Sequence, residues 1–227
     1  LRLRRAPQAV RWMYLPTILT TRMTISKLEP SRHVKGRILV YCEDERLLKV
    51  TEQEVLDFSL YPGRELSAAE EKALCAAAGR SSARGRAADM IGRRALSKKE
   101  LEKRLLQKGE SAENAAEAVA WLEEIGALDD LAYAKSVVRH YSAAGYGPAK
   151  LRDELYRRGV PRELWDDAIE TESGDNAAAI DRYIAANLRG KPADDKTMKR
   201  ISDGLRRRGF RWEDIRAALR RLDEELW

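Results

Sequence analysis

Two histidines and two cysteines, His33, His140, Cys42 and Cys75, are the residues of this sequence best suited to metal binding or nucleophilic catalysis. Metal sites and thiol–imidazole pairs usually need several such residues at short, regular spacing. Here the histidines lie in different parts of the chain, and neither cysteine has a histidine or a second thiol nearby. We therefore expect no metal, no cofactor and no disulfide. Unpaired cysteines fit a reducing cytoplasm.

The neighbouring carboxylates of Asp129 and Asp130 could bind a metal or transfer protons. Aspartates just before a helix also accept hydrogen bonds from its free N–H groups and face its positive end. We adopt this second interpretation. The sequence has no Walker loop, no dinucleotide-type glycine fingerprint and no nucleophile elbow. We therefore expect that the protein is not an enzyme.

Basic side chains offer binding rather than catalysis. Arg80–Arg104 and Arg206–Arg221 are both rich in arginine and lysine. A solvated helix face explains such runs without a ligand, and a surface for phosphates or an acidic partner is the alternative. The whole chain has 43 basic and 37 acidic residues, but residues 1–28 hold six basic residues and no acidic one. The rest is balanced, so the net charge alone is weak support for nucleic-acid binding.

The elements that position these residues form an internal repeat with a period of about 50 residues. Apolar residues and glycines recur at equivalent places in three copies. They are Leu101, Leu151 and Ile201; Leu105, Leu155 and Leu205; Gly109, Gly159 and Gly209; and Val119, Ile169 and Leu219. Repeats of this size bury their apolar faces by stacking on their neighbours. The repeat therefore predicts tandem modules.

Each copy is predicted to contain a helix, a glycine stop and a second helix. The first of these helices should begin after Ser97, Gly147 or Thr197, with a capping box between Ser97 and Glu100 and with Pro148 at the first helical position. Gly109, Gly159 and Gly209 should end it in the left-handed conformation. A further helix should precede each pair, over 83–96, 130–141 and 177–188, with Tyr133 as a packing residue.

The fold class is therefore mainly α, with three three-helix modules and a small N-terminal β-hairpin segment. Strands are predicted over 37–42 and 46–50, with 25–28 as a third strand. Short helices should run from Thr51 to about Phe58 and from Ser67 to about Gly79. No apolar run reaches the roughly 18 residues that span a membrane. The predicted domains are a disordered basic tail (1–23), the hairpin segment (24–79) and modules 80–128, 129–173 and 174–227.

The sequence contains two motifs with fixed spacing, Leu128-Asp129-Asp130 followed by Tyr133-Ala134, and Gly145-Tyr146-Gly147-Pro148. Together they resemble motifs of the RecX family, bacterial regulators of the RecA recombinase. Arg93-Arg94, Lys108-Gly109 and Arg158-Gly159-Val160 fit the same resemblance. It covers residues 80–170 strongly and the third module weakly, because that module lacks both motifs.

The resemblance implies a cytoplasmic, non-enzymatic protein that binds the RecA–DNA filament and inhibits its strand exchange and ATP hydrolysis. DNA, single- or double-stranded, is a second candidate partner, and we expect a monomer that does not bind membranes. The candidate contact residues are Arg93, Arg94, Lys108, Asp129, Asp130, Tyr146, Arg152, Arg157 and Arg158. Ser97, Gly109, Tyr133, Gly147, Pro148, Gly159 and Gly209 are expected to be structural.

Two other classes of function stay open at this stage. A helix, a glycine turn and a second helix could be a DNA-binding helix-turn-helix motif, although Glu113, Glu117, Glu163, Asp166 and Asp167 would repel phosphates in two of the three copies. The repeats could also form a scaffold for an unrelated protein.

Overall fold

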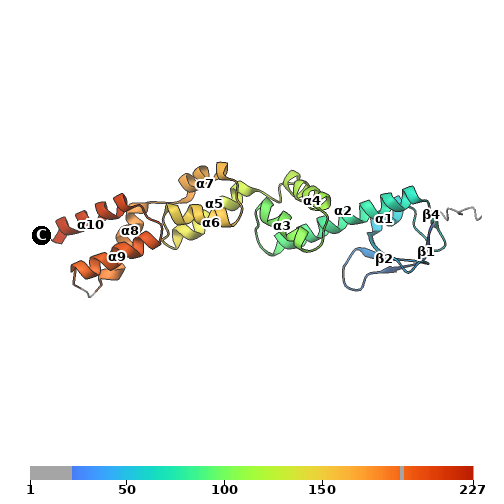
Figure 1. Cartoon of the computed structure of the whole chain (residues 1–227), viewed down its shortest axis with the longest axis horizontal. Helices are drawn as coiled ribbons and strands as arrows, with labels where there is room; N and C mark the ends of the chain where they lie inside the picture. Colours follow the sequence, from blue (N-terminus) through green and yellow to red (C-terminus); the bar gives the residue numbers. More distant parts are fainter. Residues whose placement is uncertain (1–21, 190–191, 227) are drawn as a thin grey trace, which may run out of the picture. The chain divides into compact units, whose positions relative to one another are not determined.

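The structure, a computed structural model, describes residues 22–189 and 192–226 of the chain. The chain divides into two units, Leu1–Ala78 and Gly79–Trp227, which we describe separately (Figure 1). The predicted basic tail lies outside the described residues except for Arg22 and Met23. Met23, the last residue of the predicted tail, is buried and is the first residue of a strand.

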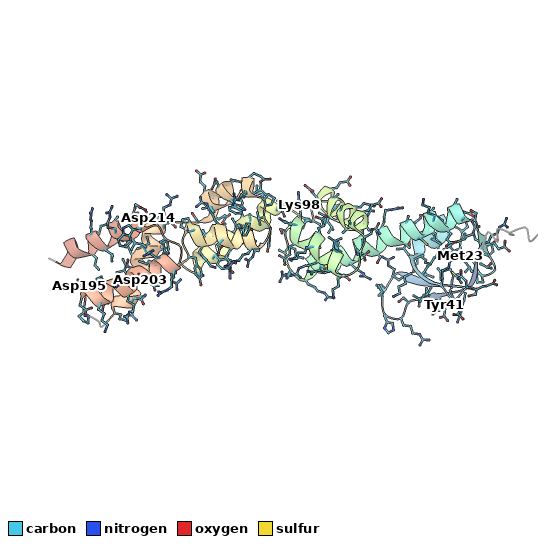
Figure 2. The ribbon with its side chains drawn as sticks, in the orientation of Figure 1. Met23, Tyr41, Lys98, Asp195, Asp203 and Asp214 are labelled. Atoms are coloured by element: carbon cyan, nitrogen blue, oxygen red, sulfur yellow. The ribbon has the colours of Figure 1, made fainter. Side chains whose placement is uncertain are left out.

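An antiparallel sheet with strand order β3-β2-β1-β4 forms the first unit together with helices. The strands are β1 (Met23–Pro30), β2 (Arg37–Cys42), β3 (Leu47–Thr51) and β4 (Glu65–Leu66). The predicted hairpin is β2 and β3, and the predicted third strand is β1, which pairs with β2. Met23 and Tyr41 mark β1 and β2 in Figure 2. Met23, Ile25 and Val40 are buried in the core of this unit.

Helix α1 (Glu52–Asp57) follows β3 directly, as the sequence predicts. The backbone N–H of Glu54 donates to Thr51 Oγ1 at 3.1 Å, and the backbone N–H of Thr51 donates to Glu54 Oε2 at 2.8 Å. Both bonds of the predicted capping box are therefore present, and they satisfy two donors that the first helical turn leaves free.

Helix α2 (Ala68–Arg93) corrects two predictions. It runs through Gly79 without a stop, and it replaces the separate helix expected over 83–96. Gly79 keeps helical geometry because the alanines and arginines that follow it favour a helix, and its missing side chain leaves room for Asn114. A Cβ atom at Gly79 would lie 2.6 Å from Asn114 Nδ2. The glycine thus serves close packing and not termination.

The second unit consists of three three-helix modules, so the predicted fold class is confirmed (Figure 1). Module 1 contains the part of α2 from Gly79 onward, α3 (Lys98–Gln107) and α4 (Ala112–Glu124). Module 2 contains α5 (Asp130–Ala143), α6 (Pro148–Arg157), the short 3-10 helix η1 (Arg162–Leu164) and α7 (Trp165–Glu172). Module 3 contains α8 (Asn176–Leu188), α9 (Asp195–Arg207) and α10 (Trp212–Leu226). Each module has its own cluster of buried apolar residues.

The glycine stops of the three modules are confirmed. The φ angles of Gly109, Gly159 and Gly209 are +87°, +69° and +89°, the left-handed region in which a side chain would be strained. Ala118 and Ala168, which are 50 residues apart and so occupy equivalent places in modules 1 and 2, are fully buried. Local sequence signals therefore set the ends of these helices correctly.

One predicted helix start and one predicted capping box need correction. Helix α9 begins after Asp194 and not after Thr197, because the Asp194 carboxylate caps the backbone N–H of Thr197 at 2.9 Å. At α3, Ser97 is the N-cap, as predicted, and accepts a hydrogen bond from the backbone N–H of Glu100 at 3.2 Å. The Glu100 carboxylate binds Arg94 and Arg104 instead of completing the capping box. Gly147 and Pro148 begin α6 as expected.

Candidate functional site

A groove of about 1030 Å³ lies in the second unit, and basic side chains from α2, α3 and the end of α6 line it. We call it the basic groove. Its cationic residues are Arg86, Arg93, Arg94, Lys99, Lys103, Arg104, Lys108, Arg157 and Arg158, against the two carboxylates of Asp89 and Glu100. Met90, Gln107, Tyr156 and Gly159 complete the lining. The groove therefore has a strong excess of positive charge in a chain that is otherwise nearly balanced.

Helical periodicity explains why α3 contributes so many cations. Leu101 and Leu105 are four residues apart and fully buried, so they fix the inner face of the helix. Lys99 and Lys103 have the same spacing but lie on another face, and both line the groove. The polar face of the amphipathic helix α3 thus forms one wall of the groove, and residues of α2 and α6 form the rest.

Some of the groove cations are held by partners within the protein. Arg94 and Arg104 both bind Glu100 at 2.7 Å, and Arg157 binds Asp153 at 3.0 Å. Arg86 binds Glu110 at 3.1 Å. Four others, Arg93, Lys99, Lys103 and Lys108, are exposed and have no ion-pair partner within residues 22–189 and 192–226. These four have charges available for a ligand.

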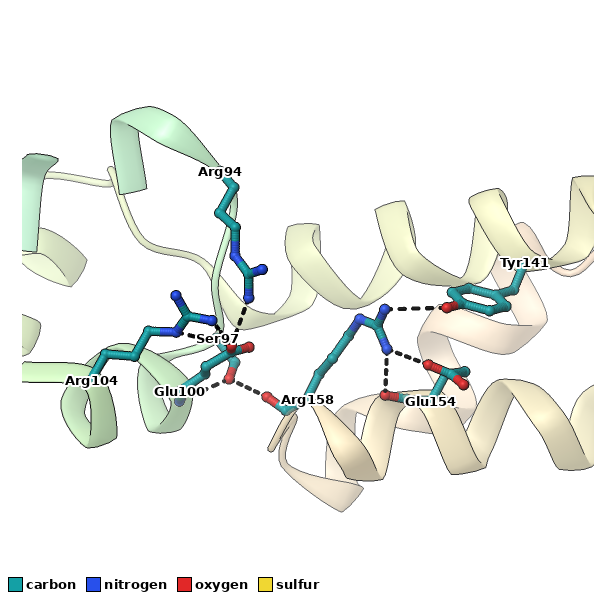
Figure 3. A network of polar contacts seen from close by, with 7 residues as sticks. All are labelled: Arg94, Ser97, Glu100, Arg104, Tyr141, Glu154 and Arg158. Atoms are coloured by element: carbon teal, nitrogen blue, oxygen red, sulfur yellow. Dashed lines mark hydrogen bonds and ion pairs between the residues drawn. The ribbon is translucent and has the colours of Figure 1, made fainter. Parts of the chain in front are cut away.

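Arg158 connects module 2 to module 1 (Figure 3). Its backbone carbonyl accepts a hydrogen bond from the Ser97 hydroxyl, the N-cap of α3. Its guanidinium binds the Glu154 carboxylate, donates to Tyr141 Oη at 3.3 Å and lies 5.4 Å from the centre of the Tyr141 ring. We therefore infer that Arg158 shapes the groove more than it offers a free charge.

The same type of joint recurs between modules 2 and 3. The backbone N–H of Gly147 donates to Arg208 O at 2.8 Å, and that of Ala149 donates to Gly209 O at 3.1 Å. The Arg208 guanidinium donates to Ala144 O at 3.0 Å and lies 5.2 Å from the centre of the Tyr146 ring. The Gly145–Pro148 turn is therefore part of a joint between modules.

The two aspartates at the start of α5 have different partners. Asp129 is its N-cap and accepts hydrogen bonds from the backbone N–H groups of Leu131 at 2.8 Å and Ala132 at 3.0 Å, as the sequence predicts. Asp130 is buried and accepts a hydrogen bond from the backbone N–H of Lys98 at 2.8 Å, so it caps α3 of the preceding module. Lys98 marks this place in Figure 2. Burial raises the pKa of Asp130 above its usual 3.8.

This geometry predicts how Asp130 tolerates substitution. Asp130→Asn keeps an acceptor for the Lys98 N–H and removes a buried charge, so we expect a free energy of unfolding within about 0.5 kcal/mol of the parent at pH 7. Asp130→Ala leaves the N–H without a partner and should lose about 1 kcal/mol or more. Urea denaturation measures both. Because the folded pKa is raised, the Asp130 contribution to stability should improve as pH falls toward it, and Asp130→Asn should lack that improvement. An equal loss in both variants at pH 7 would contradict this role.

The structure brings together five of the nine predicted contact residues. Arg93, Arg94, Lys108, Arg157 and Arg158 line the basic groove. The other four do not line it: Arg152 binds Asp166 at 3.1 Å, and Asp129, Asp130 and Tyr146 have the roles given above. The predicted packing role of Tyr133 agrees with its place beside the core of module 2.

Sequence reasoning did not select Arg86, Lys99, Lys103, Arg104 or Tyr156 as contact residues, although all five line the groove. The four cations belong to the basic run of module 1. Their spacing along two helices was the signal that could have identified them as part of one surface. Tyr156 follows the buried Leu155, so its position off the apolar stripe indicated exposure. Among the described residues, there is no group of three histidine, cysteine, aspartate or glutamate side chains placed for a metal ion. No helix in that part of the chain is long and apolar enough to cross a membrane.

Two family models match the second unit. The model described as RecX, first three-helix domain, matches residues 83–122, and the model described as RecX, second three-helix domain, matches residues 129–169. Both matches fall within the predicted modules 80–128 and 129–173. The groove-lining residues of α2 and α3, and those of α6, lie in these matched regions.

Similar proteins include two named Regulatory protein RecX. The one from Pseudomonas entomophila (strain L48) is 34% identical over 130 residues, which cover 57% of this chain and 84% of the relative. The one from Xanthomonas campestris pv. campestris (strain B100) is 37% identical over 136 residues, with 60% and 84% coverage.

Two solved structures share the fold. One is described as the crystal structure of regulatory protein RecX, with a TM-score of 0.64, 24% identity and coverage of 85% of this chain and 96% of that chain. The other, RecX from Lactobacillus salivarius, has a TM-score of 0.55, 19% identity and coverage of 64% and 97%.

Proposed function

The chain belongs to the RecX family, and from this premise we propose that it binds the filament that the RecA recombinase forms on DNA and inhibits its strand exchange and ATP hydrolysis. In this proposal the protein acts as a cytoplasmic monomer, catalyses no reaction and affects DNA repair and recombination only through its partner. The name of its relatives, regulatory protein, supports the general part of this role.

The observation that carries the proposal is the excess of cations in the basic groove. Nine cationic side chains face two carboxylates, and one of these, Glu100, is already bound by Arg94 and Arg104. A groove lined by one sign of charge attracts the opposite sign and accelerates association. A protein–DNA filament carries phosphates and acidic side chains, so the groove is the surface best suited to it among the described residues.

The helix-turn-helix alternative receives less support from the structure. A recognition helix enters the major groove with its N-terminal residues close to bases and phosphates. In module 2 the corresponding helix, α7, has Asp166 and Asp167 in its first turn. These carboxylates would repel phosphates, and we therefore do not propose sequence-specific DNA reading.

Charge reversal inside and outside the groove tests the proposal. Arg93→Glu with Lys103→Glu changes two exposed groove cations, and Arg182→Glu with Arg216→Glu makes the same change in charge at exposed residues of module 3 that do not line the groove. Co-sedimentation with RecA filaments across a salt series, together with the filament ATPase rate, is the measurement. We expect the groove variant to bind roughly tenfold more weakly or worse, with a smaller salt slope, and to inhibit less. The control should stay within about twofold of the parent, since exposed substitutions leave stability within about 0.5 kcal/mol.

Three outcomes would count against the proposal. If the parent protein neither binds filaments nor slows their ATPase at any ratio, the function is wrong, and a scaffold for another protein becomes the better interpretation. Equal weakening by the groove and control variants would show that net charge acts without the groove. Arg152→Glu tests the remaining basic candidate outside the groove, and a larger effect there than at Arg93 and Lys103 would move the contact surface to that face of α6.

A further inference from the structure

Tyr156 is an exposed aromatic residue within the basic groove. It lies on α6 and is 67% exposed, although the preceding residue, Leu155, is fully buried. It lines the groove together with Arg157, Arg158 and the cations of α3. A ring so exposed contributes little to folding, because the hydrophobic effect rewards only apolar area removed from water. Because the ring lies among cations and is not used for packing, it is available to a ligand in the groove.

The residues around Tyr156 indicate what that ligand is. Lys99, Lys103 and Lys108 provide charges without ion-pair partners among the described residues, and Arg93 adds a fourth from α2. Proteins that bind single strands combine such a cationic groove, which follows the phosphates, with aromatic side chains that stack on bases. We propose that the basic groove binds single-stranded nucleic acid, with the Tyr156 ring stacked on one base and the exposed cations on the neighbouring phosphates.

Two other occupants fit the groove less well. A duplex keeps its bases paired and stacked on each other, so no base face is free for Tyr156. An acidic protein surface would be matched by the cations alone and would gain little from a tyrosine ring among them. The single strand is the occupant that uses both features, the ring and the free charges. Binding of a strand inside a RecA filament rests on the proposed function. Binding of a free single strand does not depend on it.

The test uses the full chain and a fluorescein-labelled single-stranded DNA oligonucleotide of mixed sequence, followed by fluorescence anisotropy. Tyr156→Ala should weaken binding roughly tenfold, because one stacked base contributes that order of affinity. Tyr156→Phe keeps the ring and should stay within about twofold of the parent. Tyr61→Ala is the matched control, since Tyr61 is 55% exposed and belongs to the first unit. It should bind the oligonucleotide as the parent does.

Two further measurements separate stacking from charge. An abasic oligonucleotide with the same number of phosphates should bind the parent and Tyr156→Ala equally, because it has no base to stack. The salt slope of Tyr156→Ala on the mixed-sequence strand should equal that of the parent, because the phosphate contacts are unchanged. The duplex of the same sequence should bind both proteins equally.

The inference is overturned if Tyr156→Ala binds the mixed-sequence strand as tightly as the parent does. Displacement of the strand from the parent by polyglutamate, together with that result, would assign the groove to an acidic protein surface. Charge reversal in the groove could abolish filament binding while Tyr156→Ala leaves the affinity for the strand unchanged. That pair of results would support the proposed function and contradict only the stacking of Tyr156 on a base. Conversely, the protein could bind the strand through Tyr156 and yet not bind RecA filaments. That result would support this inference and contradict the proposed function.

Discussion

Gly147→Ala is expected to lower the free energy of unfolding of the second unit by about 2 kcal/mol or more. A Cβ atom at this position would lie 2.6 Å from Gly209 O and 2.7 Å from Phe210 N. Both are backbone atoms and cannot swing aside, so the joint between α6 and α9 has to open. Overpacking of this kind costs about 1–3 kcal/mol, and each hydrogen bond lost across the joint adds about 1 kcal/mol.

Gly92→Ala is the matched control for this substitution. Gly92 lies in helix α2, and no atom within 4 Å would meet an added Cβ. Alanine favours a helix over glycine, so this variant should be neutral or more stable by up to about 1 kcal/mol. Guanidinium denaturation compares the two, and limited proteolysis should cut Gly147→Ala faster within module 3. If both glycines accept alanine equally, the close approach of the two backbones does not contribute to stability.

Acidification is expected to remove a contribution of Glu154 to the free energy of unfolding. This contribution is similar in size to the loss expected for Gly147→Ala. Glu154 is buried, binds Arg158 and lies 2.8 Å from Lys150 Nζ. Burial alone would raise the pKa of this carboxyl, but the hydrogen bonds from Lys150 and Arg158 outweigh it and lower the pKa from 4.5 to about 2. The difference between the unfolded and folded pKa corresponds to about 3 kcal/mol at neutral pH.

The sign follows from the lowered pKa. Between the two values the unfolded chain binds the proton more readily than the folded chain, so the contribution is complete above pH 4.5 and is lost as the pH falls toward 2. Urea unfolding of the parent should therefore lose about 2 kcal/mol more between pH 7 and pH 3 than unfolding of Glu154→Gln does.

The control for this experiment is Asp153→Asn on the same helix. Asp153 is exposed and binds Arg157, and exposed pairs contribute little. This variant should keep the acid sensitivity of the parent. An unchanged pH dependence in Glu154→Gln would show that the network around Arg158 does not stabilise the ionised carboxylate.

The parts of the fold that depend on local interactions could be predicted from the sequence. The glycine stops at Gly109, Gly159 and Gly209 and the cap at Thr51 follow from residues within one or two turns of each other, which is why their spacing along the chain is sufficient. The buried columns of the helices follow from helical periodicity in the same way. Two local signals gave wrong predictions, because glycine commonly ends a helix, as was expected at Gly79, and threonine commonly caps one, as was expected at Thr197. Close packing against Asn114 and the competing cap at Asp194 decided these positions.

The contacts between residues of different modules could not be predicted from the sequence and depend on how the modules pack. Arg158 and Arg208 occupy equivalent places in the repeat and read as surface cations, yet their carbonyls bind Ser97 and Gly147 of the preceding modules. Asp130 likewise caps a helix that begins 32 residues earlier in the chain. The basic groove also depends on packing between modules, since α2, α3 and α6 each supply part of its charge. Its exposed aromatic residue, Tyr156, lies on α6. Periodicity fixes the face of a helix on which a side chain lies, but the packing of modules fixes what that face meets, because those contacts join residues far apart in the sequence.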